Sequence, residues 1–217
     1  IIEYCCGEDS VIGKRAPSEC HVVRLTKQDD LSTPDGLNKA LLAVAVAPDA
    51  LLHVSIPCTG GSQWTRVNKN KKGAAPNAAA HRKLFVALWR NLIRVARANR
   101  AKGGSISIEW PTGCSYWHLP EVKAFIKEFG LHTIDLNGCM VGLLSAAGNP
   151  VYKPWRVASD AVCVLNAFRG CKCDRNHKHD PCSGSECKRS ENYTNEFADR
   201  LHAGWKADVV LKRAGFW

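Results

Sequence analysis

Short apolar runs alternate with amphipathic stretches through the first 136 residues, and this alternation constrains the fold more than any other feature of the sequence. The run at 50–56 is apolar except for His53 and Ser55, which is typical of a strand covered on both faces of a parallel sheet. In 78–100, Leu84, Leu88 and Leu92 share one side of a helix while cations form a separate stripe. We therefore predict an α/β fold of βαβ units around a parallel sheet, with helices on both faces. The expected strands are 1–5, 21–26, 50–56, 105–109 and 131–136, and the expected helices are 36–47, 78–100 and 120–129.

The chain after residue 136 departs from this alternation. Residues 137–158 have an antiparallel pattern with a turn at 146–149. We expect three parts: a main domain at 1–160, a Cys/His-rich extension at 161–190, and a C-terminal helix within 191–217 that packs back on the main domain. Residues 68–77 have the composition of a mobile loop.

The extension contains six cysteine and histidine side chains within 17 residues: Cys171, Cys173, His177, His179, Cys182 and Cys187. Tetrahedral zinc takes four nitrogen and sulfur ligands of this kind. We expect a structural zinc site formed by Cys173, His177, His179 and Cys182, with the other two cysteines as substitutes. A catalytic zinc is less favoured, because so many ligands leave no need for an open position. The alternative is a metal-free polar loop with incidental cysteines.

The cysteine count and the hydropathy indicate the kind of environment in which the chain works. Eleven cysteines are an odd number, and the helix and strand patterns do not need disulfides, so we expect reduced thiols. No apolar run approaches the ~20 residues that cross a bilayer, and no signal peptide is evident. We expect an intracellular protein, nuclear or cytoplasmic and not secreted, without membrane partners. Because the sequence opens on Ile-Ile-Glu, we expect it to be part of a longer polypeptide.

The positive charge is concentrated in one segment. The formal net charge is +10, and 50–108 holds eleven Lys and Arg residues without a single Asp or Glu. A one-sign field of this length attracts polyanions, so we expect a nucleic-acid partner; a solubilising surface or one for an acidic partner is the alternative. The residues expected to contact nucleic acid are Trp64, Arg66, Lys69, Lys71, Lys72, Arg90 and Arg94.

Three expected strands end in unusual residues, and ligands bind outside the carboxyl ends of strands in open α/β sheets. These ends are Glu3-Tyr4-Cys5-Cys6-Gly7, Pro57-Cys58, and Glu109-Trp110-Pro111. In order and approximate spacing they resemble the motifs of the cytosine-C5 DNA methyltransferase family, although Trp110 replaces the usual Asn. The segments 137–142, 153–155 and 191–194 resemble later motifs of short members. The likeness is greatest to methyltransferase-like domains in retroelement polyproteins of dinoflagellates.

This resemblance implies a Rossmann-like methyltransferase fold, with S-adenosylmethionine as a cofactor beside the zinc expected from the Cys/His cluster. The implied substrate is cytosine in nucleic acid, with DNA favoured over RNA. Cys58 would be the nucleophile, with a pKa lowered by its loop, and Glu109 would hold the cytosine ring. The residues implied to cradle the cofactor are Glu3, Tyr4, Cys6, Gly7, Asp30 and Pro57, with Asp29 as a substitute for Asp30.

Each feature also has a purely structural interpretation. Cys58 is equally well a buried thiol, and Glu109 a helix cap or a partner of an arginine. The aromatic residues Tyr116, Trp117 and Trp155 are expected in the core or an interface rather than as platforms for bases. Two other functions therefore stay open: a catalytically inactive nucleic-acid-binding domain of a mobile-element polyprotein, and a zinc-stabilised protein-interaction module.

Overall fold

A six-stranded mixed sheet organises the molecule, as seen in a computed structural model that describes residues 1–67, 70 and 74–216. The strand order is β2-β1-β3-β4-β6-β5. β1 to β4 are parallel, and β6 is antiparallel to both of its neighbours. The predicted α/β fold is therefore confirmed, and the sheet is mixed, mostly parallel rather than fully parallel. The strands are β1 (Ile2–Cys6), β2 (Val23–Thr26), β3 (Leu51–Val54), β4 (Ser105–Pro111), β5 (His132–Asn137) and β6 (Pro154–Ser159).

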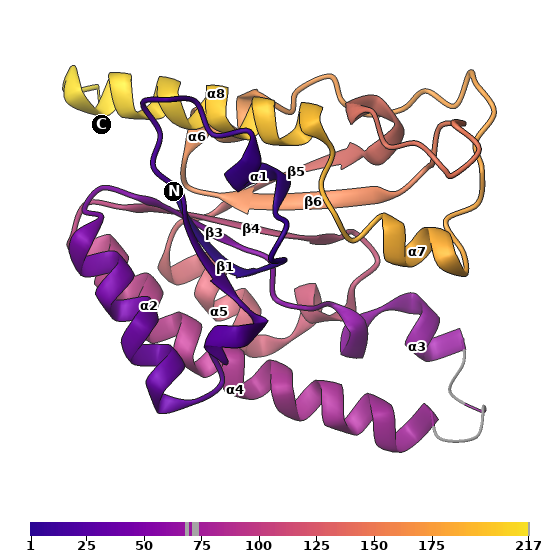
Figure 1. The fold of residues 1–217 in the computed structure, drawn as a ribbon, viewed down its shortest axis with the longest axis horizontal. Coiled ribbons are helices and arrows are strands. Elements are labelled where there is room, and N and C mark those ends of the chain that lie inside the picture. The colour runs from indigo at the N-terminus through magenta and orange to yellow at the C-terminus, as the bar shows by residue number, and fades with distance from the viewer. Residues whose placement is uncertain (68–69, 71–73, 217) are drawn as a thin grey trace.

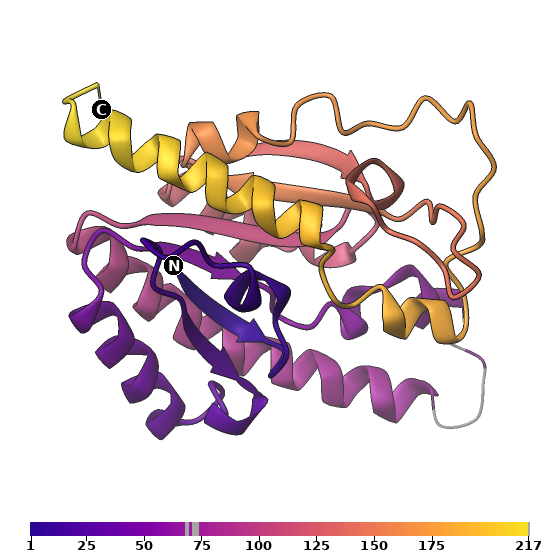
Figure 2. The same ribbon diagram turned by 45° about the horizontal axis from the view of Figure 1, so that its top comes forward.

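Helices cover both faces of this sheet (Figures 1 and 2). One face carries α2 (Pro34–Val46), α4 (Ala74–Ala101) and α5 (Pro120–Glu128), and the other carries α1 (Val11–Lys14), α6 (Val162–Asn166) and α8 (Asn195–Arg213). Two apolar cores result, one on each side of the strands. The shorter helices are α3 (Gln63–Val67), α7 (Ser185–Arg189), η1 (Lys27–Asp29), η2 (Thr59–Gly61), η3 (Ser115–His118) and η4 (Gly138–Val141).

Local sequence explains where the main helices begin. The Thr33 side chain accepts from Gly36 N at the start of α2, and Pro34 occupies the first turn. α4 starts at Ala74, four residues before the predicted start, because Pro76 in the first turn of a helix has no N–H that would need an acceptor. The described part of the expected loop at 68–77 is therefore partly helical. α8 begins at Asn195, where the Thr194 hydroxyl accepts from Phe197 N.

The order of the strands reverses between β1 and β3. From β1 the chain moves outward to β2, and from β2 it crosses back over β1 to reach β3 on the other side. Because β6 is reversed, β5 runs parallel to β4, and the carboxyl ends of β1, β3, β4 and β5 share one edge. Such a reversal is where open α/β sheets bind ligands.

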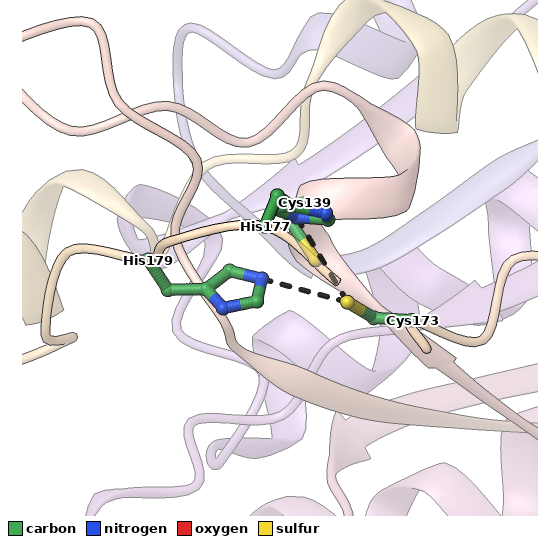
Figure 3. Close-up of side chains that lie close together, drawn as sticks. All are labelled: Cys139, Cys173, His177 and His179. Atoms are coloured by element: carbon green, nitrogen blue, oxygen red, sulfur yellow. Dashed lines mark hydrogen bonds between the residues drawn. The ribbon is translucent and has the colours of Figure 1, made fainter. Parts of the chain in front are cut away.

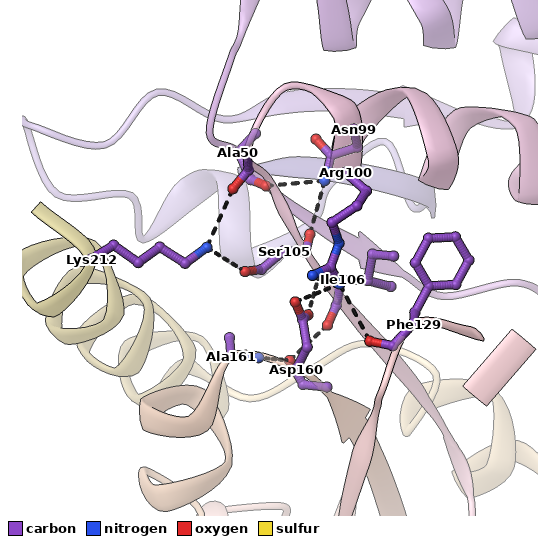
Figure 4. Close-up of polar contacts among 11 residues, drawn as sticks. Ala50, Asn99, Arg100, Ser105, Ile106, Phe129, Asp160, Ala161 and Lys212 are labelled. Atoms are coloured by element: carbon purple, nitrogen blue, oxygen red, sulfur yellow. Dashed lines mark hydrogen bonds and ion pairs between the residues drawn. The ribbon is translucent and has the colours of Figure 1, made fainter. Parts of the chain in front are cut away.

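The opposite edge of the sheet is fixed by a network of polar contacts (Figure 4). Asn99 Nδ2 donates to Ala50 O at 3.2 Å and Ser105 O at 2.9 Å, which joins α4 to β4 and the start of β3. Asp160 accepts from Ile106 N at 2.7 Å and pairs with Arg100 at 2.6 Å. These bonds satisfy backbone groups where the strands begin, so the polar groups at this edge already have partners within the fold.

α8 packs on α6 and α1. Among the described residues, no helix has both the length and the apolar composition needed to cross a bilayer. The structure also contains no disulfide among its described cysteines.

Candidate active-site cavity and metal site

A cavity of about 570 Å³ opens at the carboxyl ends of β1, β3 and β4. Its size is within the range of small-molecule and cofactor sites. Most of the residues expected for the cofactor and for catalysis line it, although they come from distant parts of the sequence: Glu3, Cys6, Gly7, Asp30, Pro57, Cys58 and Glu109.

The end of β1 forms one wall of this cavity. Glu3 Oε1 accepts from Ser10 Oγ at 2.5 Å, while Oε2 is buried without a hydrogen-bond partner among the described residues. Burial raises the pKa of Glu3, and the Ser10 bond opposes that rise. Cys5 adopts φ +67°, a left-handed conformation that L residues rarely take, where the pairing with β2 shifts register. A Cβ on Gly7 would meet only Asn192 Oδ1, at 3.9 Å, so Gly7 borders open space.

Tyr4 does not lie in this wall, so its expected role in cofactor binding is wrong. Successive residues of a strand point to opposite faces, and Tyr4 therefore faces the core when Glu3 faces the cavity side. Its side chain is buried, and its hydroxyl donates to Leu88 O at 3.1 Å.

The two candidate acids after β2 have different surroundings. Asp29 accepts from Thr26 N at 2.7 Å and completes a capping box, so its carboxylate already stabilises the start of η1. Asp30 lines the cavity and is exposed, with its carboxylate accepting from Ser32 Oγ at 2.6 Å. Asp30 is thus the better placed of the two to bind a ligand.

Cys58 follows β3 and precedes η2, where it forms part of the cavity wall. The expected lowering of its pKa is wrong. Burial, together with the charge of Glu109, raises the pKa of the Cys58 thiol to about 11, against a smaller opposing effect of Lys153. The thiol is therefore protonated at neutral pH in this structure.

Glu109 sits at the end of β4 with only 8% of its surface exposed. Its Oε2 accepts from the Tyr193 hydroxyl at 2.8 Å, and Oε1 has no hydrogen-bond partner among the described residues. Burial raises the pKa of Glu109 to about 7, although Lys153 and Tyr193 both favour the ionised form. A carboxyl group that titrates near neutrality suits proton donation or acceptance.

Tyr193 and His53 belong to the site but were not predicted from the sequence. The Tyr193 hydroxyl also lies 2.8 Å from Ser55 Oγ and 3.2 Å from His53 Nε2. Two sequence signals were available: the resemblance of 191–194 to a later family motif, and the strand period of two, which places His53 and Ser55 on one face of the sheet. Burial lowers the pKa of His53 to about 3, so this imidazole is neutral.

The aromatic side chains near the cavity belong largely to the core. Trp110 is buried and donates through Nε1 to Ile56 O at 2.6 Å. Tyr116 and Trp117 pack edge-on against Trp110, and Trp155 is buried on the other face, which confirms the structural interpretation for these residues.

A second group of candidate side chains lies close together, with Cys139 from η4 and three residues from the loop at 171–180 (Figure 3). One possible metal-binding atom from each of Cys139, Cys173, His177 and His179 lies within 4.8 Å of the others. Cys173 Sγ is 3.5 Å from His179 Nε2 and 3.9 Å from His177 Nε2. Tetrahedral zinc with ordinary bond lengths separates its ligand atoms by about 3.4 to 3.8 Å. The Cys2His2 group therefore fits a metal ion such as zinc.

Three of the four expected metal ligands are in this group, but the fourth is Cys139 and not Cys182. Cys139 lies in η4, directly after β5, and thus at the edge of the sheet where the loop 171–180 crosses. Cys182 Sγ instead lies 3.4 Å from Ser190 Oγ. Arg175 N donates to Cys173 Sγ at 3.2 Å, a contact that stabilises a thiolate ligand.

The described part of the basic segment carries exposed arginines on α4. Arg90 and Arg94 are exposed, and no ion pair in the described structure involves them, whereas Arg97 pairs with Glu128 at 2.7 Å. Trp64 and Arg66 lie on α3. Lys69, Lys71 and Lys72, which were also expected to bind nucleic acid, are outside the described residues.

Comparison with known proteins gives no family for this chain. No protein-family model, no curated protein and no solved structure matches it.

Proposed function

We propose that the chain is an S-adenosylmethionine-dependent methyltransferase of Rossmann-like fold that acts on cytosine in nucleic acid, DNA rather than RNA. One observation carries the proposal: a single cavity at the carboxyl ends of β1, β3 and β4 is lined by Glu3, Cys58 and Glu109. These are the residues for which the resemblance to cytosine-C5 methyltransferases implies cofactor, nucleophile and base contacts.

The cavity fits a ligand with several hydrogen-bond donors. Two of its buried carboxylates, Glu3 and Glu109, each keep one oxygen without a hydrogen-bond partner among the described residues. An unsatisfied buried acceptor is costly, so these oxygens favour a bound donor. Glu3, Cys6, Gly7 and Asp30 would hold S-adenosylmethionine, which supplies a methyl group when bound.

Cys58 and Glu109 would act on the base. Carbon 5 of cytosine becomes nucleophilic when the Cys58 thiolate bonds to carbon 6 and the double-bond electrons move toward carbon 5 and N3. Glu109 would stabilise that charge by donating to N3. Once carbon 5 has gained the methyl group, a water molecule would accept its proton, the ring double bond would return, and the sulfur–carbon bond would break to restore the Cys58 thiolate.

The raised pKa values of these two groups are linked. The Glu109 carboxylate raises the pKa of Cys58, so a protonated Glu109 makes the thiolate easier to form. Lys153 favours the ionised form of both groups. The reactive state is therefore a Cys58 thiolate next to a neutral Glu109, which is the state that thiolate addition to cytosine requires.

We assign a structural role to the Cys2His2 group, with zinc as its metal. Four protein ligands close the coordination shell and leave no position for a reacting water. The metal would tie η4 to the loop at 171–180, and that loop leads to α7 and to Tyr193 at the cavity.

A second candidate, a domain that binds nucleic acid without catalysis, is favoured by the high pKa of Cys58 and by the exposed Arg90 and Arg94. Arginines on one helix face neutralise phosphates without reading sequence. Unlike the methyltransferase, such a domain needs no cofactor.

Two measurements test the proposal. Calorimetry with S-adenosylmethionine and with its demethylated product should show binding, and Asp30→Ala should weaken it. DNA with 5-fluorocytosine should form a covalent adduct with the cofactor-loaded protein, because fluorine replaces the proton that must leave. Cys58→Ser should abolish the adduct, and Cys114→Ser, which alters a nearby buried thiol, should retain it. Cofactor binding without an adduct on DNA or RNA would overturn the mechanism, and no cofactor binding would favour the second candidate.

A further inference from the structure

Tyr193 meets three groups that project from one face of the sheet. His53 pairs in register with Ser107, and along each strand residues two positions apart share a face, which places Ser55 and Glu109 on the same side. The Tyr193 hydroxyl lies within 3.2 Å of His53, Ser55 and Glu109, in the segment directly before α8. The residue therefore connects the end of the chain to the centre of the sheet.

The hydrogen-bond capacity of Tyr193 fixes the direction of each bond. A phenol has one proton to donate and two lone pairs to accept. Because an ionised Glu109 can only accept, the phenolic proton goes to Oε2, and His53 and Ser55 donate to the phenolic oxygen. His53 Nδ1, 3.3 Å from Ser107 Oγ, is then the acceptor of that hydroxyl. Burial raises the pKa of Tyr193 well above 10, so its proton stays in place.

This arrangement favours one oxygen of Glu109 as the place for its proton. A proton on Oε2 would make Tyr193 accept from Glu109, so the phenolic proton would have to turn to Ser55 or His53 and reverse that bond, whereas a proton on Oε1 leaves all three bonds as they are. Oε1 has no hydrogen-bond partner among the described residues and is free to carry the proton.

We propose that Tyr193 is a positioning residue that assigns the proton of Glu109 to Oε1, so that the cavity presents a donor to a ring nitrogen with a free lone pair, such as N3 of cytosine. The identity of the ring rests on the proposed function, whereas the place of the proton rests on the contacts of Tyr193 alone.

The electrostatic surroundings of Glu109 define what a titration will measure. Burial is the largest cause of its raised pKa, and Lys153 and Tyr193 lower it. The thiols of Cys58 and Cys114 also face Glu109, and both have pKa values raised partly by its charge. These thiols are protonated across the range in which Glu109 titrates, so they do not obscure its pKa.

The experiment is a pH titration of the Glu109 carboxyl carbon by NMR, in protein with ¹³C-labelled glutamate, with the signal assigned through Glu109→Gln. Tyr193→Phe keeps the ring that stacks on Phe197 at 4.3 Å and removes only the hydroxyl. Loss of a donor to the carboxylate should raise the pKa of Glu109 by about one unit. Ser55→Ala should raise the pKa of Glu109 by less, because the Tyr193 hydroxyl still donates to the carboxylate and loses only the Ser55 hydrogen bond that strengthens it.

The control is Tyr116→Phe, which removes a buried hydroxyl that has no hydrogen-bond partner among the described residues and should leave the pKa of Glu109 unchanged. An unchanged or lowered pKa in Tyr193→Phe would refute the positioning role; if that variant does not fold, Ser55→Ala decides by the same criterion. The titration needs neither cofactor nor nucleic acid. A shifted pKa in a protein that methylates no cytosine would therefore refute the proposed function and leave the role of Tyr193 standing.

Discussion

Replacing Cys139 by Ala distinguishes the metal site of the structure from the one expected from sequence spacing. With zinc bound, Cys139 and Cys173 are cross-linked across a loop of about 35 residues. The chain-entropy relation for a cross-link of that length gives about 4 kcal/mol of stabilisation. We therefore expect Cys139→Ala to lower the free energy of unfolding by about 4 kcal/mol and to lose zinc.

Cys182→Ala is the matched control, because it removes a cysteine of the same segment that lies outside the group. Its sulfur lies 3.4 Å from Ser190 Oγ, so the loss should be below about 1 kcal/mol. This variant should keep one zinc per chain.

Elemental analysis and urea unfolding, with and without a chelator, measure both effects. The chelator should destabilise the parent protein and Cys182→Ala, and it should leave Cys139→Ala unchanged. The assignment fails if Cys182→Ala loses zinc while Cys139→Ala keeps it, or if parent protein purified without chelator holds no metal.

Three further predictions concern charge. Double replacement of Arg90 and Arg94 by Ala should reduce the slope of log binding constant against log salt concentration by about 2, as measured by fluorescence anisotropy with nucleic acid. Arg97→Ala should change this slope less, because Arg97 is already paired with Glu128. Because folding raises the pKa of Glu109 from about 4.5 to about 7, the free energy of unfolding should fall by about 3 kcal/mol as pH rises through that interval. Urea unfolding at successive pH values should show this fall in the parent protein and not in Glu109→Gln. Asp160→Ala should lower the free energy of unfolding by about 2 to 4 kcal/mol in the same assay. The substitution leaves the buried Ile106 N–H without its acceptor and breaks the partly exposed ion pair with Arg100.

The sheet and its helices were predictable because local patterns decide them. The apolar run at 50–56 and the helical spacing in 78–100 both correspond to observed elements, β3 and α4. The same rule of alternation, applied strictly, would have excluded Tyr4 from the cavity, because Glu3 and Tyr4 cannot face the same side of a strand.

The remaining errors concern contacts between distant segments. Cys139 is 34 positions from Cys173, and only the fold shows that β5 ends beside the loop at 171–180. The raised pKa of Cys58 depends on burial by several strands and on the charge of Glu109. The segment 191–194 carried a motif resemblance, but the contact of the Tyr193 hydroxyl with Glu109 depends on how the chain before α8 crosses the ends of β3 and β4.

The position of β6 has a consequence for the growing chain on the ribosome. β6 lies between β4 and β5 although it is made after both. Until residue 159 has emerged, β4 presents an unpaired edge, and its residues from Ser105 to Trp110 are buried only in the finished fold. At usual rates of translation, the interval between the end of β4 and the end of β6 lasts roughly 2 to 10 s. Nascent chains should therefore be most prone to mispairing, and to capture by chaperones, during that interval.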